Sequence, residues 1–345
     1  MKHGARELTK SAKANRAMTR PITERITLAL TLALTLTGQS LAQTPLRVSV
    51  FQGISNMPIF AAQAQGYFAR HGLSVELINT RNSDDLRDGL AAGTHQIAHA
   101  GVDNAVALAE SGKAEVAVVV GGNAGFGRLI TQPDIATLED LRGRRVAVDA
   151  PNTANALVLY KVLQGHGLTR ADYKVAAVGG TALVVEAMLK DPTLAAAIIS
   201  PPFAFRALQG GLKDHGHARA ANGAFQFDAG FVTRPWAAAN AEVLVRYLQS
   251  YVEGVRWTLD GANRSAAVAL LAARLKLSAG DAAQTYALIV HPETGIAREA
   301  RLDLPGFRNT LALRAEILGQ WGGNAPPAER FVDLSYYQRA LDALR

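Results

Sequence analysis

The sequence predicts an α/β protein built from two sheet units followed by a helical segment. Short β-like runs alternate with helix-like runs over residues 46–120, and the alternation restarts at residue 145 after a glycine-rich interruption. From residue 235 onward the apolar residues repeat with helical spacing. Regular strand–helix alternation is typical of a largely parallel sheet with helices on both faces, so we expect two such units.

Each expected element follows from this periodicity. In the first unit we expect strands over 47–51, 73–78, 96–100 and 114–120, alternating with helices over 58–70, 83–92 and 103–111. In the second unit we expect strands over 145–149, 173–178 and 195–199, alternating with helices over 154–164, 181–189 and 202–209. Five helices should follow, over 236–259, 262–274, 281–290, 304–321 and 328–344, with Ser278 as the N-cap of the third. Helices without strands cannot form a third sheet, so we expect them to pack onto one of the two units.

Composition and charge exclude several classes of protein. The chain has 345 residues, of which 49% are hydrophobic and 19% charged, so its length predicts about two folded domains. It has no cysteine, which excludes disulfides, thiolate catalysis, iron–sulfur clusters and cysteine-ligated zinc. Residues 1–42 carry a net charge of +5 out of the overall +7. The rest is nearly neutral and has no basic stripe, so we expect no nucleic-acid binding.

The first 42 residues have the pattern of a secretory signal peptide. A basic stretch precedes an uncharged, mostly apolar run at 26–37, and the small residues Ser40 and Ala42 suit signal peptidase. The run is shorter than the roughly 20 residues that span a bilayer. We therefore expect export to the periplasm with cleavage after Ala42, whether translation starts at Met1 or at Met18.

Polar residues follow the predicted strands at the edge where open parallel sheets bind ligands. Ligands lie beyond the carboxyl ends of such strands, where helix N-termini converge. These loops are rich in Gly, Ser, Thr and Asn, which supply hydrogen-bonding groups but also serve the turns and caps that any such loop needs. We expect a cleft for a small polar or anionic ligand, with candidate binding residues Ser55, Asn56, Ser83, Asp103, Asn123, Asn152, Thr153, Asn155, Thr181 and Ser200.

The charged and aromatic residues of these loops leave the nature of the ligand open. Asp103 is either an N-cap or a cleft carboxylate, which would favour a cation, a hydroxyl or a ring N–H over a bare anion. Arg81 is the only arginine in the loops, so a bidentate grip on an anion is not assured. Phe203, Phe225 and Phe227 either form an apolar wall of the cleft or pack in the hydrophobic core; both alternatives are open.

Three motifs that could carry other chemistry each depart from their pattern. Residues 122–129 have the spacing of a phosphate-binding loop but lack its Lys and its Ser/Thr. Residues 53–57 begin like a nucleophile elbow but end in Met57 instead of glycine. The histidines at 95 and 99 are too far apart on a strand for one metal ion, and those at 215 and 217 are expected in a loop. We therefore expect no enzymatic activity, no metal and no cofactor.

The run QGISNMPIFAAQAQGYFARHGLSVE, at residues 52–76, resembles the opening of the nitrate/sulfonate/taurine-type periplasmic substrate-binding proteins. The stretches at 84–93, 138–148 and 231–236 agree with it, and the resemblance extends over residues 46–345. It implies the type 2 periplasmic binding architecture, in which two α/β lobes, each a mostly parallel sheet flanked by helices, are joined by two crossover strands. The implied crossovers lie near 126–130 and 229–233, and the C-terminal helices would complete the first lobe. Lobe 1 would then comprise residues 43–128 and 233–345, and lobe 2 residues 129–232.

The same resemblance implies a function. These proteins are the solute receptors of ABC importers, so the chain is expected to deliver a small molecule to a membrane permease and its ATPase. The expected solute is a sulfonate, a nitrate, an aromatic acid or a heterocycle, captured by hinge closure of a monomer. Two alternatives remain: an enzyme on the same fold, of the pyrimidine- or menaquinone-pathway kind, or a sensing module for a membrane receptor.

Overall fold

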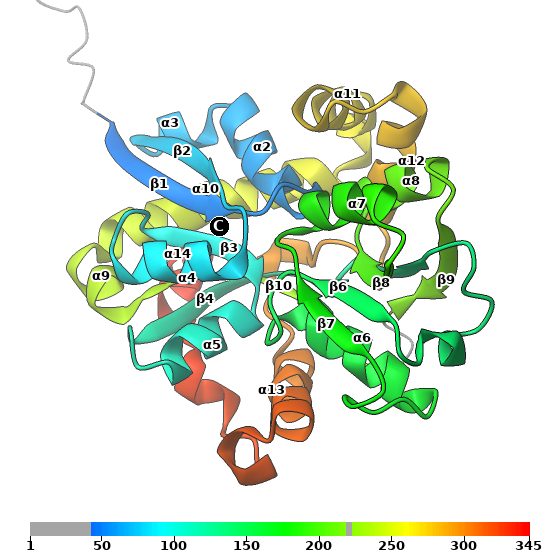
Figure 1. Cartoon of the computed structure of the whole chain (residues 1–345). Helices are drawn as coiled ribbons and strands as arrows, with labels where there is room; N and C mark the ends of the chain where they lie inside the picture. The colour runs from blue at the N-terminus through cyan, green and yellow to red at the C-terminus, as the bar shows by residue number, and fades with distance from the viewer. Residues whose placement is uncertain (1–42, 219–222) are drawn as a thin grey trace, which may run out of the picture. The chain divides into compact units, whose positions relative to one another are not determined.

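The computed structural model describes residues 43–218 and 223–345, which form two mixed sheets flanked by helices (Figure 1). The predicted α/β, two-lobed class is confirmed. The predicted signal peptide lies outside the described residues. Within the described residues, no helix is both long and apolar enough to cross a membrane.

The first sheet holds five strands in the order β2-β1-β3-β10-β4. Its strands are β1 (Thr44–Val50), β2 (Leu73–Asn79), β3 (Ile97–Gly101), β4 (Val116–Asn123) and β10 (Asp228–Thr233). Side chains alternate between its two faces, as a pleated strand requires. On β4, Val119 packs in the core beneath α2 (Met57–Ala64) and α10 (Ala241–Leu259), whereas Val118 packs in the core on the opposite face.

The second sheet has the same design, in the order β7-β6-β8-β5-β9. Its strands are β5 (Arg128–Thr131), β6 (Arg145–Val148), β7 (Lys174–Ala177), β8 (Leu194–Ile199) and β9 (Lys213–His217). The helices α6 (Ala154–Gly165), α7 (Thr181–Lys190) and α8 (Phe203–Gln209) connect or follow them. Residues 215 and 217 were predicted to lie in a loop, which is wrong. They belong to β9, whose polar sequence hides its pairing with β5, where the imidazole of His215 lies 3.0 Å from the hydroxyl of Thr131.

One strand in each sheet runs against the others, and these two strands carry the chain between the sheets. The strand β5 follows β4 of the first sheet and pairs antiparallel with β8 of the second. The strand β10 returns from the second sheet and pairs antiparallel with β3 and β4. Both sheets are therefore mostly parallel, with a single antiparallel strand that begins or ends near the space between them.

Several helices are shorter than the apolar spacing predicts. The helix expected over 58–70 is broken by Gly66, whose φ of +70° suits glycine, into α2 and α3 (Tyr67–Arg70). The helix expected from residue 236 is divided at Asn240 into α9 (Arg234–Ala239) and α10. The remaining helices are α4 (Ser83–Ala91), α5 (Asp103–Glu110), α11 (Arg264–Leu275), α12 (Ala279–Ile289), α13 (Leu304–Leu318) and α14 (Ser335–Asp342). Ser278 caps α12 as predicted, because its hydroxyl accepts the backbone N–H of Asp281.

The helix α13 contributes to the cores of both sheets. Near its start, Phe307 and Leu311 pack beside β10 and α5 of the first sheet. Near its end, Leu313 and the partly buried Ile317 pack with α6 of the second sheet. The C-terminal segment is thus not confined to one sheet, and α13 brings its polar side chains to the boundary between the two.

Close packing of α10 on α2 requires glycine at position 254. A Cβ there would lie 2.1 Å from the carbonyl oxygen of Pro58, so Gly254→Ala is expected to lower the free energy of unfolding by about 2 kcal/mol. Gly165, in α6, is the matched control because a Cβ there meets nothing within 4 Å. Gly165→Ala should leave stability unchanged or raise it by about 0.5–1 kcal/mol. Denaturant unfolding of both variants measures the difference, and equal effects would contradict this packing.

Candidate functional site

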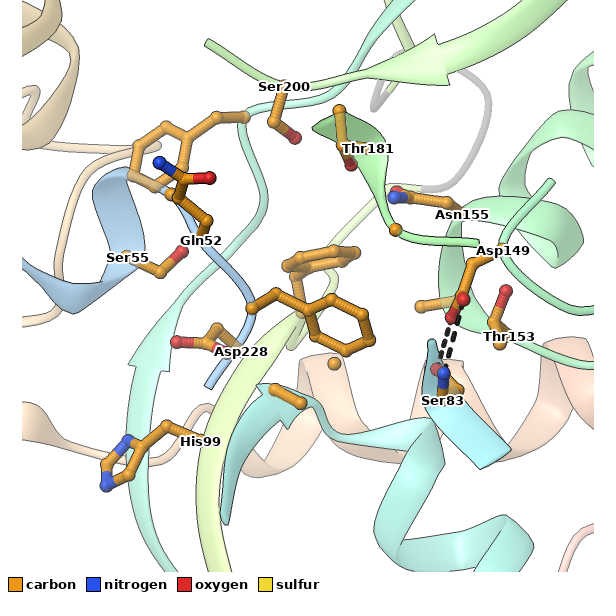
Figure 2. Close-up of a pocket in the computed structure, with 18 of the residues that line it drawn as sticks. Gln52, Ser55, Ser83, His99, Asp149, Thr153, Asn155, Thr181, Ser200 and Asp228 are labelled. Carbon is orange, nitrogen blue, oxygen red and sulfur yellow. Dashed lines mark hydrogen bonds between the residues drawn. The ribbon is translucent and has the colours of Figure 1, made fainter. Parts of the chain in front are cut away.

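A cavity of about 100 Å³ lies where the loops of the two sheets face each other (Figure 2). The first turns of four helices reach it: Ser83 begins α4, Asp103 begins α5, Ala154 begins α6 and Thr181 begins α7. Helix N-termini present unpaired backbone N–H groups and a positive end of the helix dipole. The cavity is therefore a polar recess formed by residues from both sheets.

Eight of the ten predicted binding residues line this cavity, namely Ser55, Asn56, Ser83, Asp103, Thr153, Asn155, Thr181 and Ser200. The other two stand behind it. The side-chain amide of Asn123 donates to the hydroxyl of Ser55 at 3.0 Å, and the backbone carbonyl of Asn152 accepts from Arg314 at 3.0 Å. Thr153 also has a local role, because its buried hydroxyl donates to the carbonyl of Ala150 at 2.9 Å. Whether these residues hold a ligand stays a prediction.

Hydrogen bonds cross the cavity from one sheet unit to the other. Asp149, which follows β6, accepts from both the hydroxyl and the backbone N–H of Ser83 at the start of α4 (Figure 2). The backbone N–H of Gly180, before α7, donates to the carbonyl of Arg81 at 2.8 Å. Burial raises the pKa of Asp149, although its hydrogen bonds to Ser83 oppose that rise. These contacts hold the two walls of the cavity together.

Asp103 is a buried carboxylate and not an N-cap. Helix α5 begins at Asp103, its N-cap residue is Val102, and no side chain caps that end. Neither carboxylate oxygen of Asp103 has a hydrogen bond of normal geometry in the described part of the chain. The guanidinium of Arg314, on α13, lies 3.7 Å away, and both side chains are 1% exposed. Burial raises the pKa of Asp103 to about 7 in spite of the positive charges of Arg314 and Arg87.

A second buried carboxylate, Asp228, begins the crossover strand β10 and lines the same cavity. Figure 2 shows it below Ser55, and His99 lies on the neighbouring strand β3, where it pairs with Gly230 of β10. Burial raises the pKa of Asp228 to about 7 and lowers the pKa of His99 to about 3. His99 is therefore neutral at physiological pH, and the hydroxyl of Tyr247 lies 3.0 Å from its Nε2 atom.

Aromatic side chains complete the walls of the cavity. Of the three phenylalanines considered from the sequence, Phe203 and Phe227 line it, whereas Phe225 is buried in the core of the second sheet. Phe51 and Phe126 also line the cavity and were not predicted from the sequence. Among the described lining residues there is no lysine or arginine. Nor does any set of three His, Asp or Glu side chains in residues 43–218 and 223–345 lie close enough to hold a metal ion.

The carboxylates Asp149 and Asp228 were also missed, for different reasons. Asp149 ends a predicted strand, so the rule that ligands lie beyond the carboxyl ends of strands could have found it. Asp228 stands at the amino end of β10, and only the antiparallel direction of that strand brings it to the same edge. No pattern of spacing in the sequence reveals that direction.

Comparison with known proteins agrees with this architecture. The family model described as NMT1/THI5 like matches residues 54–203. The periplasmic nitrate-binding protein NrtA of Synechocystis PCC 6803 superposes with a TM-score of 0.71 at 14% identity, over 88% of this chain and 89% of that one. The chain has the periplasmic binding protein fold. The resemblance stated from the sequence is thereby confirmed.

Further solved structures share the periplasmic binding protein fold. The ligand-binding component of an ABC-type import system from Staphylococcus aureus, with zinc bound, has a TM-score of 0.73 at 15% identity, over 86% of this chain and 99% of that one. The alkanesulfonate-binding protein SsuA of Xanthomonas axonopodis pv. citri, bound to MOPS, has a TM-score of 0.68 at 16% identity, over 84% of this chain and 98% of that one. No curated protein matches the chain by sequence.

The same fold also occurs in an enzyme. The desulfurization enzyme DSZB superposes with a TM-score of 0.60 at 13% identity, over 87% of this chain and 99% of that one. The structures described above are binding proteins, so the fold is used mainly for binding among these neighbours. The fold alone therefore does not distinguish binding from catalysis, and the cavity's own residues decide between them.

Proposed function

We propose that the chain is an extracytoplasmic solute receptor of an ABC importer, which captures a small organic molecule between its two sheets. One observation carries this proposal: the cavity is lined by residues that follow strands of both sheets, at the N-termini of four helices. A ligand in that position contacts both halves of the molecule at once. Nitrate and sulfonate are ligands of the neighbours and are not assigned to this chain.

Capture would proceed by hinge closure about the two crossover strands. Lobe 1 would comprise residues 43–128 and 233–345, and lobe 2 residues 129–232, with β5 and β10 passing between them. A ligand that bridges the lobes favours the closed form by its differential affinity for the two forms. The hydrogen bonds of Ser83 with Asp149 and of Gly180 with Arg81 would form as the walls meet.

The partners and the location follow from this role. A closed, loaded receptor would dock on a membrane permease driven by an ATPase, and it would act as a monomer in the periplasm after removal of residues 1–42. No covalent step is proposed. Ser55 is the side chain that a hydrolase would use, and its hydroxyl accepts from Asn123, a group that cannot take its proton.

Blocking the cavity tests the proposal. Asn155 lines the cavity from the first turn of α6, and its side chain has no hydrogen bond to another described residue, so Asn155→Trp should fill the cavity with little loss of stability. A ligand at 100 times its dissociation constant stabilises the folded form by about 2.7 kcal/mol. Fractions of a small-molecule extract should therefore raise the melting temperature of the wild type and leave Asn155→Trp unchanged.

Asn324→Trp is the matched control, because Asn324 is exposed after α13 and lies outside the cavity. It should respond to the extract like the wild type. An equal response of all three proteins would place binding elsewhere. If the wild type converts the bound molecule to a product and Ser55→Ala does not, the protein is an enzyme and not a receptor.

A further inference from the structure

The ionisable groups of the cavity are unsuited to an anion. Its described lining contains three carboxylates, Asp103, Asp149 and Asp228, and a histidine that stays neutral. Arg314 is the cation in contact with one of them, and it lies behind Asp103 with 1% of its side chain exposed. An anionic ligand would meet like charges at short range and no arginine or lysine fork to bind it.

At two of the four helix N-termini that reach the cavity, a carboxylate of the chain itself stands where an anion would bind. The backbone N–H and hydroxyl of Ser83, at the start of α4, both donate to Asp149. The chain's own carboxylate thus stands where a bound anion would stand. At the start of α5, Asp103 places a second carboxylate beside the cavity.

Two of these carboxylates lack well-placed hydrogen-bond donors. The carboxylate oxygens of Asp103 have no hydrogen bond of normal geometry in the part of the chain described here, although the backbone N–H of Ala154 acts to lower the pKa of that carboxyl. For Asp228, burial raises the pKa, and no hydrogen bond or charge from residues 43–218 or 223–345 opposes that rise. Both residues are at least 97% buried, and a buried carboxylate without donors is strongly unfavourable. A ligand that carries N–H donors and a positive charge would supply the hydrogen bonds and the counter-charge that these carboxylates lack.

This inference rests on the proposed function and names the class of solute. We propose that the cavity binds an organic cation, with an amidinium or ammonium group directed to Asp228 and Asp103 and a small aromatic or apolar body. The phenylalanines at 51, 126, 203 and 227 supply walls for that body, and aromatic faces also attract cations. A bare metal ion is disfavoured because the three carboxylates do not form a coordinating set.

Three probes of one shape and different charge test the proposal: benzamidine, benzamide and benzoate. Titration calorimetry at pH 8 should give the affinity order benzamidine, then benzamide, then benzoate, with at least tenfold between the first and the last. Asp228→Asn should weaken benzamidine binding about tenfold or more, as the loss of a charge-assisted hydrogen bond predicts. Asp88→Asn, at an exposed carboxylate paired with Lys113, is the control and should leave the affinity unchanged.

The pH dependence gives a second readout with a definite sign. Benzamidine stays charged between pH 5 and 9, so its affinity should fall below pH 7, by up to about tenfold per pH unit for each carboxylate that becomes protonated. Benzoate should show no such fall. Tyr247 and Tyr251, whose pKa values burial raises, interact with Asp228, and Arg314, Arg87 and Asp149 interact with Asp103. His99, which also lines the cavity, stays neutral.

The outcomes separate this inference from the proposed function. Benzoate binding as tightly as benzamidine, benzamide matching benzamidine, or no binding of benzamidine would each overturn the cation assignment. If an extract still stabilises the wild type but not Asn155→Trp, the receptor function survives such a result. If the extract has no effect on either protein, the receptor function itself fails.

Discussion

At pH 8, where Asp103 is ionised, replacing Arg314 with methionine is expected to lower the free energy of unfolding by about 3–5 kcal/mol, because it leaves the buried carboxylate without its positive partner. The guanidinium lies 3.7 Å from the carboxylate of Asp103, and its Nε–H donates to Gln320 at 2.8 Å. Its Nη1 donates to the carbonyl of Asn152, in the loop before α6. The variant therefore leaves the carboxylate of Asp103 without its positive partner. It also removes the hydrogen bond that joins α13 to the loop before α6.

An exposed arginine on the same helix provides the control. Arg308 pairs with Glu329 at 2.9 Å, with side chains 58% and 63% exposed, so Arg308→Met should change stability by less than about 1 kcal/mol. Adding Asp103→Asn to Arg314→Met should recover part of the loss, because the stranded charge is removed as well. Urea unfolding of the wild type, the two single variants and the double variant gives the coupling. Strict additivity of the two substitutions would show that the pair does not interact.

Replacing Asp228 with asparagine is expected to stabilise the protein above pH 7 and to have little effect near pH 4. Burial raises the pKa of Asp228 from the ordinary 3.8 to about 7. Between these values the folded state keeps a proton that the unfolded state has lost. Stability therefore falls as the pH rises from about 4 to about 7 and then levels off. For one carboxylate this loss is on the order of 4 kcal/mol, and the uncharged amide of the variant does not incur it.

Unfolding free energies of the ligand-free protein at pH 4, 6 and 8 measure this difference. The wild type should lose more stability across the range than Asp228→Asn, while Asp103 continues to contribute in both proteins. Asp88→Asn, at an exposed position, should follow the wild-type curve. A variant curve parallel to that of the wild type would mean that Asp228 is ionised at its ordinary pKa.

The sequence was informative about the fold where local periodicity carries the signal. The strands at 145–148 and 194–199 and the helices at 83–91 and 181–190 lie within one or two residues of their predicted bounds. It was least informative where tertiary contacts decide. The polar strand β9 exists because β5 pairs with it, and α13 crosses to the second sheet because Leu313 meets α6.

For the candidate site, spacing located the loops but not their electrostatics. The predicted Ser, Thr and Asn residues surround the cavity because strand ends and helix starts converge at one edge. The charge of the cavity depends on residues that meet only after folding. Asp228 reaches it through an antiparallel strand, and Arg314 approaches Asp103 from a helix far along the chain. A polar or anionic ligand was a fair inference from loop composition, and the buried carboxylates argue against the anion.

Native mass spectrometry of the protein after incubation with a small-molecule extract tests the central claim most directly. If the cavity between the sheets captures a solute, the wild type and Asn324→Trp should each retain one small molecule, and Asn155→Trp should retain none. Retention of the same molecule by Asn155→Trp, or of no molecule by the wild type, would contradict the account.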